Sequence, residues 1–162
     1  MNIEQERQAA VAEAKTWINT PYHHEARVKG PDGGIDCAQL LYMVYRACDL
    51  IPEFTIEHYS HDWHLHQNAE RYLGKVFDYS VWQEDPNYKP QPADIVIWKV
   101  GRVFSHAGIF TDYPTFIHAY VNRVCNYENI EKAVYLNVLG RGDPEQGKQR
   151  ERRIYTLQRW ML

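Results

Sequence analysis

The sequence has few cysteines, no excess of positive charge and no long apolar run, and each absence excludes a class of protein. Three cysteines among 162 residues are an odd number, so a disulfide framework is not expected and free thiols are the simpler interpretation. A formal net charge of −3 gives no basic surface for nucleic acid or an anionic membrane, so neither is expected as a partner. Residues 1–10 are polar, unlike a signal peptide, and no later stretch is long enough to span a bilayer.

The chain shows no internal repeat, low-complexity tract or interdomain linker. Its length suits one hydrophobic core, so we expect a single domain over residues 1–162. Without an export signal, we expect a protein that is cytoplasmic when it is synthesised.

Two helices are predicted in the first part of the chain. Residues 4–18 carry apolar side chains at helical spacing, which predicts a first helix. A second helix is predicted to begin directly after Asp36, because Val44 and other apolar residues share one helical face with Cys37. Residues 23–35, rich in glycine and charge, predict an irregular loop between the two helices.

Short β-type runs dominate the second half of the chain. A loop and a short helix are predicted within residues 58–72, and prolines then mark an extended connection up to residue 92. Helices first and strands afterwards indicate an α+β fold, in which N-terminal helices pack on a C-terminal antiparallel sheet. The predicted strands are residues 95–100, 103–111, 115–120, 123–127, 133–139 and 154–160.

Cys37 is the first candidate for chemistry. A cysteine in the first turn of a helix meets unpaired backbone N–H groups and the positive end of the helix dipole, and both stabilise a thiolate. The same N–H groups can stabilise an oxyanion after attack on a carbonyl, and Asp36 is well placed to cap the helix. The alternative is that Cys37 is a small buried core residue, as free cysteines often are.

Two histidines in neighbouring predicted strands strengthen the catalytic interpretation. Alternation places His106 on one sheet face with Gly108, which leaves room beside the imidazole. If residues 112–114 form a turn, a register that pairs Phe110 with residue 114 sets His106 opposite His118, and a slip by two makes them diagonal neighbours. One imidazole could then accept the cysteine proton while the other orients it. The alternative is two unrelated histidines in a half-buried sheet.

Several short motifs follow one another between about residues 20 and 120. They are Thr20-Pro21-Tyr22, Asp36-Cys37, Pro92-Ala93-Asp94-Ile95-Val96-Ile97, Ser105-His106-Ala107-Gly108-Ile109 and Ile117-His118-Ala119. In these motifs and their order the chain resembles the NlpC/p-60 family, which comprises papain-like cysteine peptidases of the bacterial cell wall. The resemblance implies a papain-like NlpC-type fold without metal or organic cofactor.

The resemblance implies a role for each matching residue. Cys37 would be the nucleophile, His106 the general base and His118 the residue that orients the base. Tyr22 would lie over the site, where its hydroxyl helps to hold the oxyanion. The usual reaction of the family is hydrolysis of the γ-D-glutamyl–diaminopimelate bond, so a peptidoglycan stem peptide is the implied substrate.

The chain also departs from the family pattern near these residues. Ala38-Gln39 follows the cysteine where Ser-Gly is common, His23-His24 follows the tyrosine where Trp-Gly is frequent, and Ala93 replaces a typical glycine. We expect the departures to line the substrate site, so the sequence does not fix the exact bond cleaved. The residues expected on the oxyanion and substrate side are Tyr22, His23, His24, Asp36, Ala38, Gln39 and Ser105.

A catalytic domain without export signal or wall-binding repeat resembles the tail-associated version carried by phages, prophages and gene transfer agents. Such a protein would be part of the virion tail and contact other tail proteins. Two alternatives stay open: a structural tail-assembly protein that uses the hydrolase fold for docking, and a papain-like amidase or acyltransferase with another substrate. The intact Cys37, His106 and His118 argue against a decayed site.

A histidine-rich stretch invites a metal hypothesis. His58, His61, His64 and His66 lie close together in sequence. They have no nearby cysteine and no recognised ligand spacing, and on a helix they would spread over a wide arc. We therefore expect no metal site, and expect these histidines to flank the substrate site.

Overall fold

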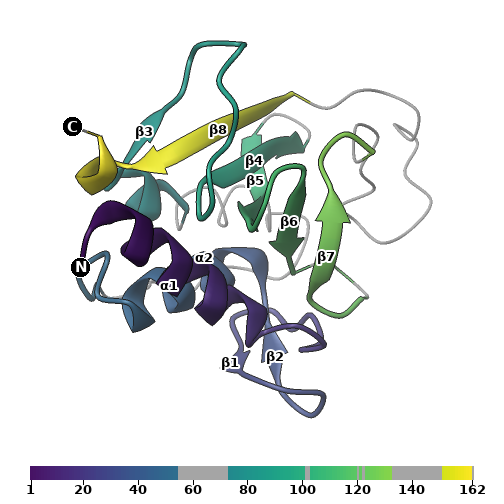
Figure 1. The fold of residues 1–162 in the computed structure, drawn as a ribbon. Helices are drawn as coiled ribbons and strands as arrows, with labels where there is room; N and C mark the ends of the chain where they lie inside the picture. The colour runs from purple at the N-terminus through teal and green to yellow at the C-terminus, as the bar shows by residue number, and fades with distance from the viewer. Residues whose placement is uncertain (55–72, 101–102, 120, 122, 133–150, 162) are drawn as a thin grey trace.

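The computed structural model describes residues 1–54, 73–100, 103–119, 121, 123–132 and 151–161 (Figure 1). Two helices lie in the first part of the chain. Helix α1 (Ile3–Lys15) begins at a capping box in which Asn2 and Gln5 bond reciprocally, and helix α2 (Cys37–Ala47) begins directly after Asp36. In the part of the chain that is described, no helix combines the length and apolarity needed to cross a membrane.

The described residues form a two-stranded and a six-stranded sheet, and all pairs of strands within them are antiparallel. The small sheet is the hairpin of β1 (Arg27–Val28) and β2 (Gly34–Ile35). The large sheet has the order β3-β8-β4-β5-β6-β7. Its strands are β3 (Ser80–Trp82), β4 (Ile95–Val100), β5 (Val103–Phe110), β6 (Thr115–His118), β7 (Asn126–Asn129) and β8 (Arg152–Leu157), and a 3₁₀ turn, η2 (Gln158–Trp160), follows.

The predicted α+β architecture is confirmed, with local differences. Strand β3 lies in a region for which no strand was predicted. The strand expected at 123–127 lies at 126–129, and the last strand ends at residue 157, before the 3₁₀ turn. The hairpin β1–β2 occupies the region predicted as an irregular loop, because strands of two residues are too short to show alternation. The elements predicted at 58–72 and 133–139 lie outside the described residues.

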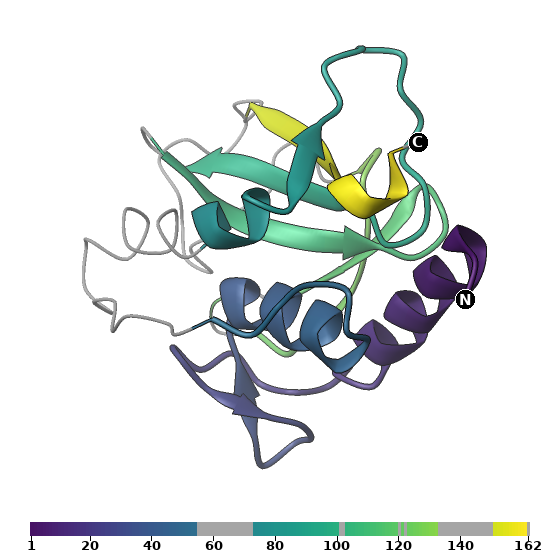
Figure 2. The ribbon, with the colours of Figure 1, turned by 90° about the vertical axis from the view of Figure 1, so that its left-hand side faces the viewer.

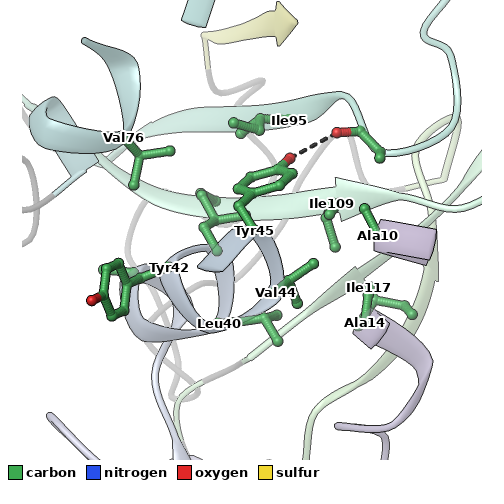
Figure 3. Packing of buried hydrophobic residues seen from close by; sticks show 14 of the residues in the cluster. Ala10, Ala14, Leu40, Tyr42, Val44, Tyr45, Val76, Ile95, Ile109 and Ile117 are labelled. Carbon is green, nitrogen blue, oxygen red and sulfur yellow. Dashed lines mark hydrogen bonds between the residues drawn. The ribbon is translucent and has the colours of Figure 1, made fainter. Parts of the chain in front are cut away.

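Helices α1 and α2 cover one face of the large sheet, and the β1–β2 hairpin lies on the far side of α2 (Figure 2). Because strand side chains alternate between faces, each strand feeds two separate clusters. The helix-facing cluster is mainly aliphatic and includes Ile95, Ile97, Ala107, Ile109 and Ile117 (Figure 3). The cluster on the other face comprises Val96, Trp98, Phe110, Phe116 and Ile130.

A buried polar network fixes the turn that leads into β4. Arg7 of α1 donates to the Asp94 carboxylate at 2.9 Å and to the Pro92 carbonyl at 2.7 Å. The Tyr45 hydroxyl of α2 donates to the Ala93 carbonyl at 2.7 Å, the bond drawn in Figure 3. Ala93 has φ of +69°, a left-handed conformation that costs an L-residue about 1 kcal/mol and that glycine adopts freely. This backbone requirement explains why glycine is typical at the position.

Candidate active site

The N-terminus of α2 presents Cys37 at the edge of the helix–sheet interface. Asp36 is the N-cap: one carboxylate oxygen accepts the Gln39 backbone N–H and the other accepts the Glu25 backbone N–H, each at 2.8 Å. The cap inferred from sequence is therefore confirmed, and it also ties the preceding loop to the start of the helix. Cys37 is 7% exposed, so little of the thiol meets solvent.

The thiol lies against β5 on both sides of His106. Sγ–H donates to the Ser105 carbonyl at 3.5 Å, and the Ala107 backbone N–H also bonds to the sulfur. These main-chain groups point toward β6, and the pairs of β5 with β6 within the described residues are at Ile109 and Phe110. The sulfur thus contacts main-chain groups of β5 that lie outside the described β5–β6 pairs.

Burial decides the protonation state of this thiol. The backbone N–H groups of Cys37, Ala38 and Ala107 lower its pKa, as expected at a helix N-terminus. Burial, with a smaller contribution from the Asp36 charge, outweighs them and raises the pKa to about 12. The thiolate expected from the helix dipole is therefore not the resting form, and the sulfur is held as a neutral thiol that donates to Ser105.

His106 and His118 come together on the face of the sheet opposite the helices. The observed register pairs Ile109 with Ile117 and Phe110 with Phe116, which is the slipped alternative of the two considered from sequence. His106 Nε2 lies 2.9 Å from His118 Nδ1, so the two imidazoles are hydrogen-bonded diagonal neighbours. They are 6% and 3% exposed.

Gly108 makes this approach of the strands possible. A Cβ at this position would lie 2.7 Å from the Phe116 ring, 2.9 Å from the Ile117 carbonyl oxygen and 3.3 Å from His118 Cβ. The first two separations are shorter than real Cβ contacts allow. The room beside the imidazole that the sequence suggested is therefore filled by β6 itself.

Burial lowers the pKa of His118 to about 4, with a smaller contribution from the Arg123 charge. His118 is therefore neutral near pH 7, and its Nδ1 can accept a hydrogen bond. The consistent tautomer has His106 donating from Nε2–H, which places the basic lone pair of His106 on Nδ1. Such an imidazole can take a proton from a thiol and remain oriented by His118.

Two aromatic side chains hold the histidine pair in a closed cycle of four rings. Trp98 lies 5.5 Å from His106 and 5.1 Å from Phe116 between ring centroids. Phe116 lies 5.0 Å from His118, and His118 lies 5.1 Å from His106. Sequence reasoning missed both: Phe116 is two residues before His118 on the same face of β6, whereas Trp98 meets His106 only through the pairing of β4 with β5.

Tyr22 is placed beside the nucleophile by backbone pairing. Its N–H donates to the Arg123 carbonyl at 2.9 Å, and Tyr22 bridges Ile35, two residues before Cys37. Burial raises the pKa of Tyr22, and the charges of Cys37 and Asp36 contribute to the same shift. The phenol is therefore a neutral donor close to the thiol.

The model of the NlpC/P60 family matches residues 19–140, a span that contains Cys37, His106 and His118. The chain belongs to the NlpC/P60 family. Members of this family are generally cysteine peptidases that hydrolyse cell-wall peptidoglycan.

Solved structures support the same fold. The chain is similar to NlpC1 from Trichomonas vaginalis (TM-score 0.57, 21% identity) over 82% of this chain and 41% of that one. It is similar to NlpC2 from the same organism (TM-score 0.57, 19% identity) over 93% and 48% of the two chains. It also resembles the NlpC/p60 domain of the peptidoglycan hydrolase SagA (TM-score 0.50, 18% identity) over 78% and 91%. The chain spans less than half of each Trichomonas protein, and no curated protein matches it.

The residues predicted on the oxyanion and substrate side of this NlpC/P60 domain take different places. Ala38 and Ser105 are 1% and 4% exposed, and Ser105 meets the thiol through its carbonyl. His23 is exposed, and the His24 imidazole lies 3.7 Å from the Glu25 carboxylate. Gln39 is buried and accepts a hydrogen bond from Arg27 Nε.

No metal site is found in the described part of this NlpC/P60 domain: no three His, Cys, Asp or Glu side chains there could hold an ion together. The histidines of the predicted flanking stretch, His58, His61, His64 and His66, lie outside the described residues.

Proposed function

We propose that this chain is a cysteine peptidase that hydrolyses peptidoglycan stem peptides at a bond of the γ-D-glutamyl–diaminopimelate type. Cys37 would act as nucleophile, His106 as general base and His118 as the residue that orients it. The observation that carries the proposal is the 2.9 Å bond between His106 Nε2 and His118 Nδ1, on a strand whose flanking backbone groups contact the Cys37 sulfur.

The first chemical step starts from a neutral pair. His106 Nδ1 accepts the thiol proton while sulfur bonds to the scissile carbonyl carbon, and the carbonyl π electrons move to oxygen. The imidazolium so formed keeps its Nε2–H directed at His118 Nδ1. The side chains of the site are almost completely buried, so little water is present to stabilise the charges that form in this step. Hydrogen-bond donors directed at the oxyanion must therefore stabilise the negative charge.

Three groups can donate hydrogen bonds to the oxyanion. The backbone N–H groups of Cys37 and Ala38 point at the sulfur from the first turn of α2, and the neutral Tyr22 phenol lies nearby. When the intermediate collapses, the C–N bond breaks and the leaving amine takes the proton from His106. Water then attacks the thioester, gives a proton to His106 and releases the free acid, and the thiol is restored.

The wider setting is part of the proposal. The chain is proposed to act as one domain over residues 1–162, to be synthesised in the cytoplasm and to reach the wall as part of a phage or prophage tail, beside other tail proteins. This part of the proposal rests on analogy with tail-associated members of the family.

The test is mass spectrometry of defined stem peptides incubated with the wild type, Cys37→Ala and Cys48→Ala. Cys48 lies at the other end of α2, so Cys48→Ala is the matched thiol control. We expect cleavage after D-glutamate by the wild type and Cys48→Ala and none by Cys37→Ala, with unchanged melting temperatures. If Cys48→Ala alone lost cleavage, the assignment of Cys37 as the nucleophile would be wrong. A folded wild type that cleaves no stem peptide would favour the structural tail role or another acyl substrate.

A further inference from the structure

The β1–β2 hairpin holds a cation close to the nucleophile. Arg27 is opposite Ile35 in the hairpin register, and Ile35 precedes Cys37 by two residues. Paired Cα atoms lie about 5 Å apart and two residues span at most about 7 Å, so the Cα atoms of Arg27 and Cys37 lie within about 12 Å. Arg27 therefore lies beside the N-terminal half of α2, the end of the helix that carries the nucleophile.

The Arg27 guanidinium is oriented by two buried side chains of α2. Its Nε donates to Gln39 Oε1, and its plane lies over the Tyr42 ring, 4.9 Å from the centroid. Gln39 is 1% exposed and Tyr42 is 5% exposed, whereas Arg27 is exposed. A buried amide oxygen costs free energy unless it is bonded, so Gln39 and Arg27 position each other.

This arrangement leaves the outer edge of the guanidinium available. Arginine has five N–H donors, and the bond to Gln39 uses the one on Nε. Two parallel N–H groups on the Nη atoms match the two oxygens of a carboxylate, and holding the long side chain in advance reduces the entropy lost on binding.

Lys29 in the same hairpin shows the contrast. Its ammonium lies 2.7 Å from the Glu13 carboxylate, so its charge is already paired. Among the described residues, no carboxylate lies within ion-pair distance of Arg27. A cation that is fixed by neutral side chains and lacks a carboxylate partner in the described structure is suited to take one from a ligand.

We propose that Arg27, held by Gln39 and Tyr42, is a binding site for a free carboxylate of the peptide substrate next to the scissile amide. The inference rests on the proposed peptidase function and gives it a substrate class: acidic peptides rather than peptides whose carboxylates are amidated. Gln39, which departs from the usual family residue, is then the positioning residue for this specificity.

The test compares two tripeptides, L-Ala-γ-D-Glu-diaminopimelate with all carboxylates free and the same peptide with every carboxylate converted to carboxamide. We expect the wild type to cleave the acidic peptide with a kcat/KM at least about tenfold higher, the size of a charge-assisted hydrogen bond. Arg27→Ala should remove this preference through a higher KM for the acidic peptide and leave the amidated peptide unchanged. Arg27→Lys should retain part of the preference for the acidic peptide. Lys29→Ala, the matched control, should retain the full preference.

Binding is followed separately by NMR, on the Arg27 Nε–Hε signal of Cys37→Ala. We expect a saturable shift with the acidic peptide and none with the amidated one. If Arg27→Ala lowered kcat/KM equally for both peptides, the role of Arg27 would be purely structural. If the wild type cleaved both peptides at equal rates, the carboxylate site would be overturned and the peptidase function would stand. If the wild type cleaves neither, the peptidase function fails, and the NMR signal alone decides: a shift with the acidic peptide keeps the carboxylate site, and no shift overturns it.

Discussion

The two faces of the large sheet are built from the same strands but carry different chemistry. The face under the helices is aliphatic and closed, with Ile109 and Ile117 fully buried. The opposite face carries aromatic rings and both histidines of the candidate triad. Neighbours in one strand therefore serve different purposes, Ile117 for packing and His118 for the site. Substituting a helix-facing residue of a strand should therefore lower stability. Substituting its neighbour on the histidine face should lower catalytic activity.

The largest expected effect is on catalysis, at the histidine face. His106→Ala should lower kcat/KM by about 10³-fold or more, because the group that accepts the thiol proton is lost. His118→Ala should lower it less, because it removes only the orientation of the base. Steady-state kinetics at fixed pH measures both. Equal and small losses would contradict the assignment of the triad.

The next effect is on stability, and it compares adjacent residues of β6. Ile117→Ala should lower the free energy of unfolding by about 2–5 kcal/mol through a cavity under the helices, with kcat/KM unchanged below the melting temperature. Phe116→Leu should cost about 1 kcal/mol but lower kcat, because the ring packed on His118 is lost. Urea unfolding and kinetics on the two variants measure the separation. A kcat loss in Ile117→Ala equal to that in Phe116→Leu would break the comparison.

The histidine face should also make the free energy of unfolding depend on pH. The pKa of His118 is about 4 in the folded protein and near 6.5 when unfolded, so the unfolded chain binds more protons between these values. The free energy of unfolding should therefore fall by about 3 kcal/mol as the pH drops from 6.5 to 4. His118→Asn should remove this part of the slope in urea unfolding at several pH values. An unchanged slope would show that other groups cause it.

The smallest expected effect concerns Gly108, on the histidine face of β5. Gly108→Ala should cost about 2 kcal/mol and lower kcat, because the added methyl collides with Phe116 and with the Ile117 carbonyl oxygen. Gly74→Ala is the matched control, since nothing lies within 4 Å of its added Cβ. Thermal melts and kinetics on the pair check the prediction. A tolerated Gly108→Ala would mean that β6 can move without disturbing His118.

The sequence predicted the elements whose patterns are long enough to read. The strand at residues 95–100 is confirmed at both ends, and α2 begins at Cys37 as its apolar face indicated. The proximity of His106 and His118 followed from alternation and a short turn, although the register was left between two choices. Local spacing and turn chemistry were sufficient for these features.

The remainder depends on contacts between distant parts of the chain. The protonation of Cys37 depends on burial, which no local pattern reports, so the pKa of the thiol does not follow from its place at a helix N-terminus alone. The hairpin β1–β2 has strands of two residues, too short for any period to appear. Arg27 could not be singled out from the sequence, because the fold brings Gln39 and Tyr42 beside it and these two side chains orient it.

The buried thiol has a consequence for redox chemistry. Because burial raises the pKa of Cys37 to about 12, the thiol is almost entirely un-ionised near pH 7. Peroxide and simple alkylating agents react with the thiolate, so the resting protein should resist sulfenic acid formation and be modified slowly. The nucleophile should therefore stay reduced when the folded protein is kept under oxidising conditions.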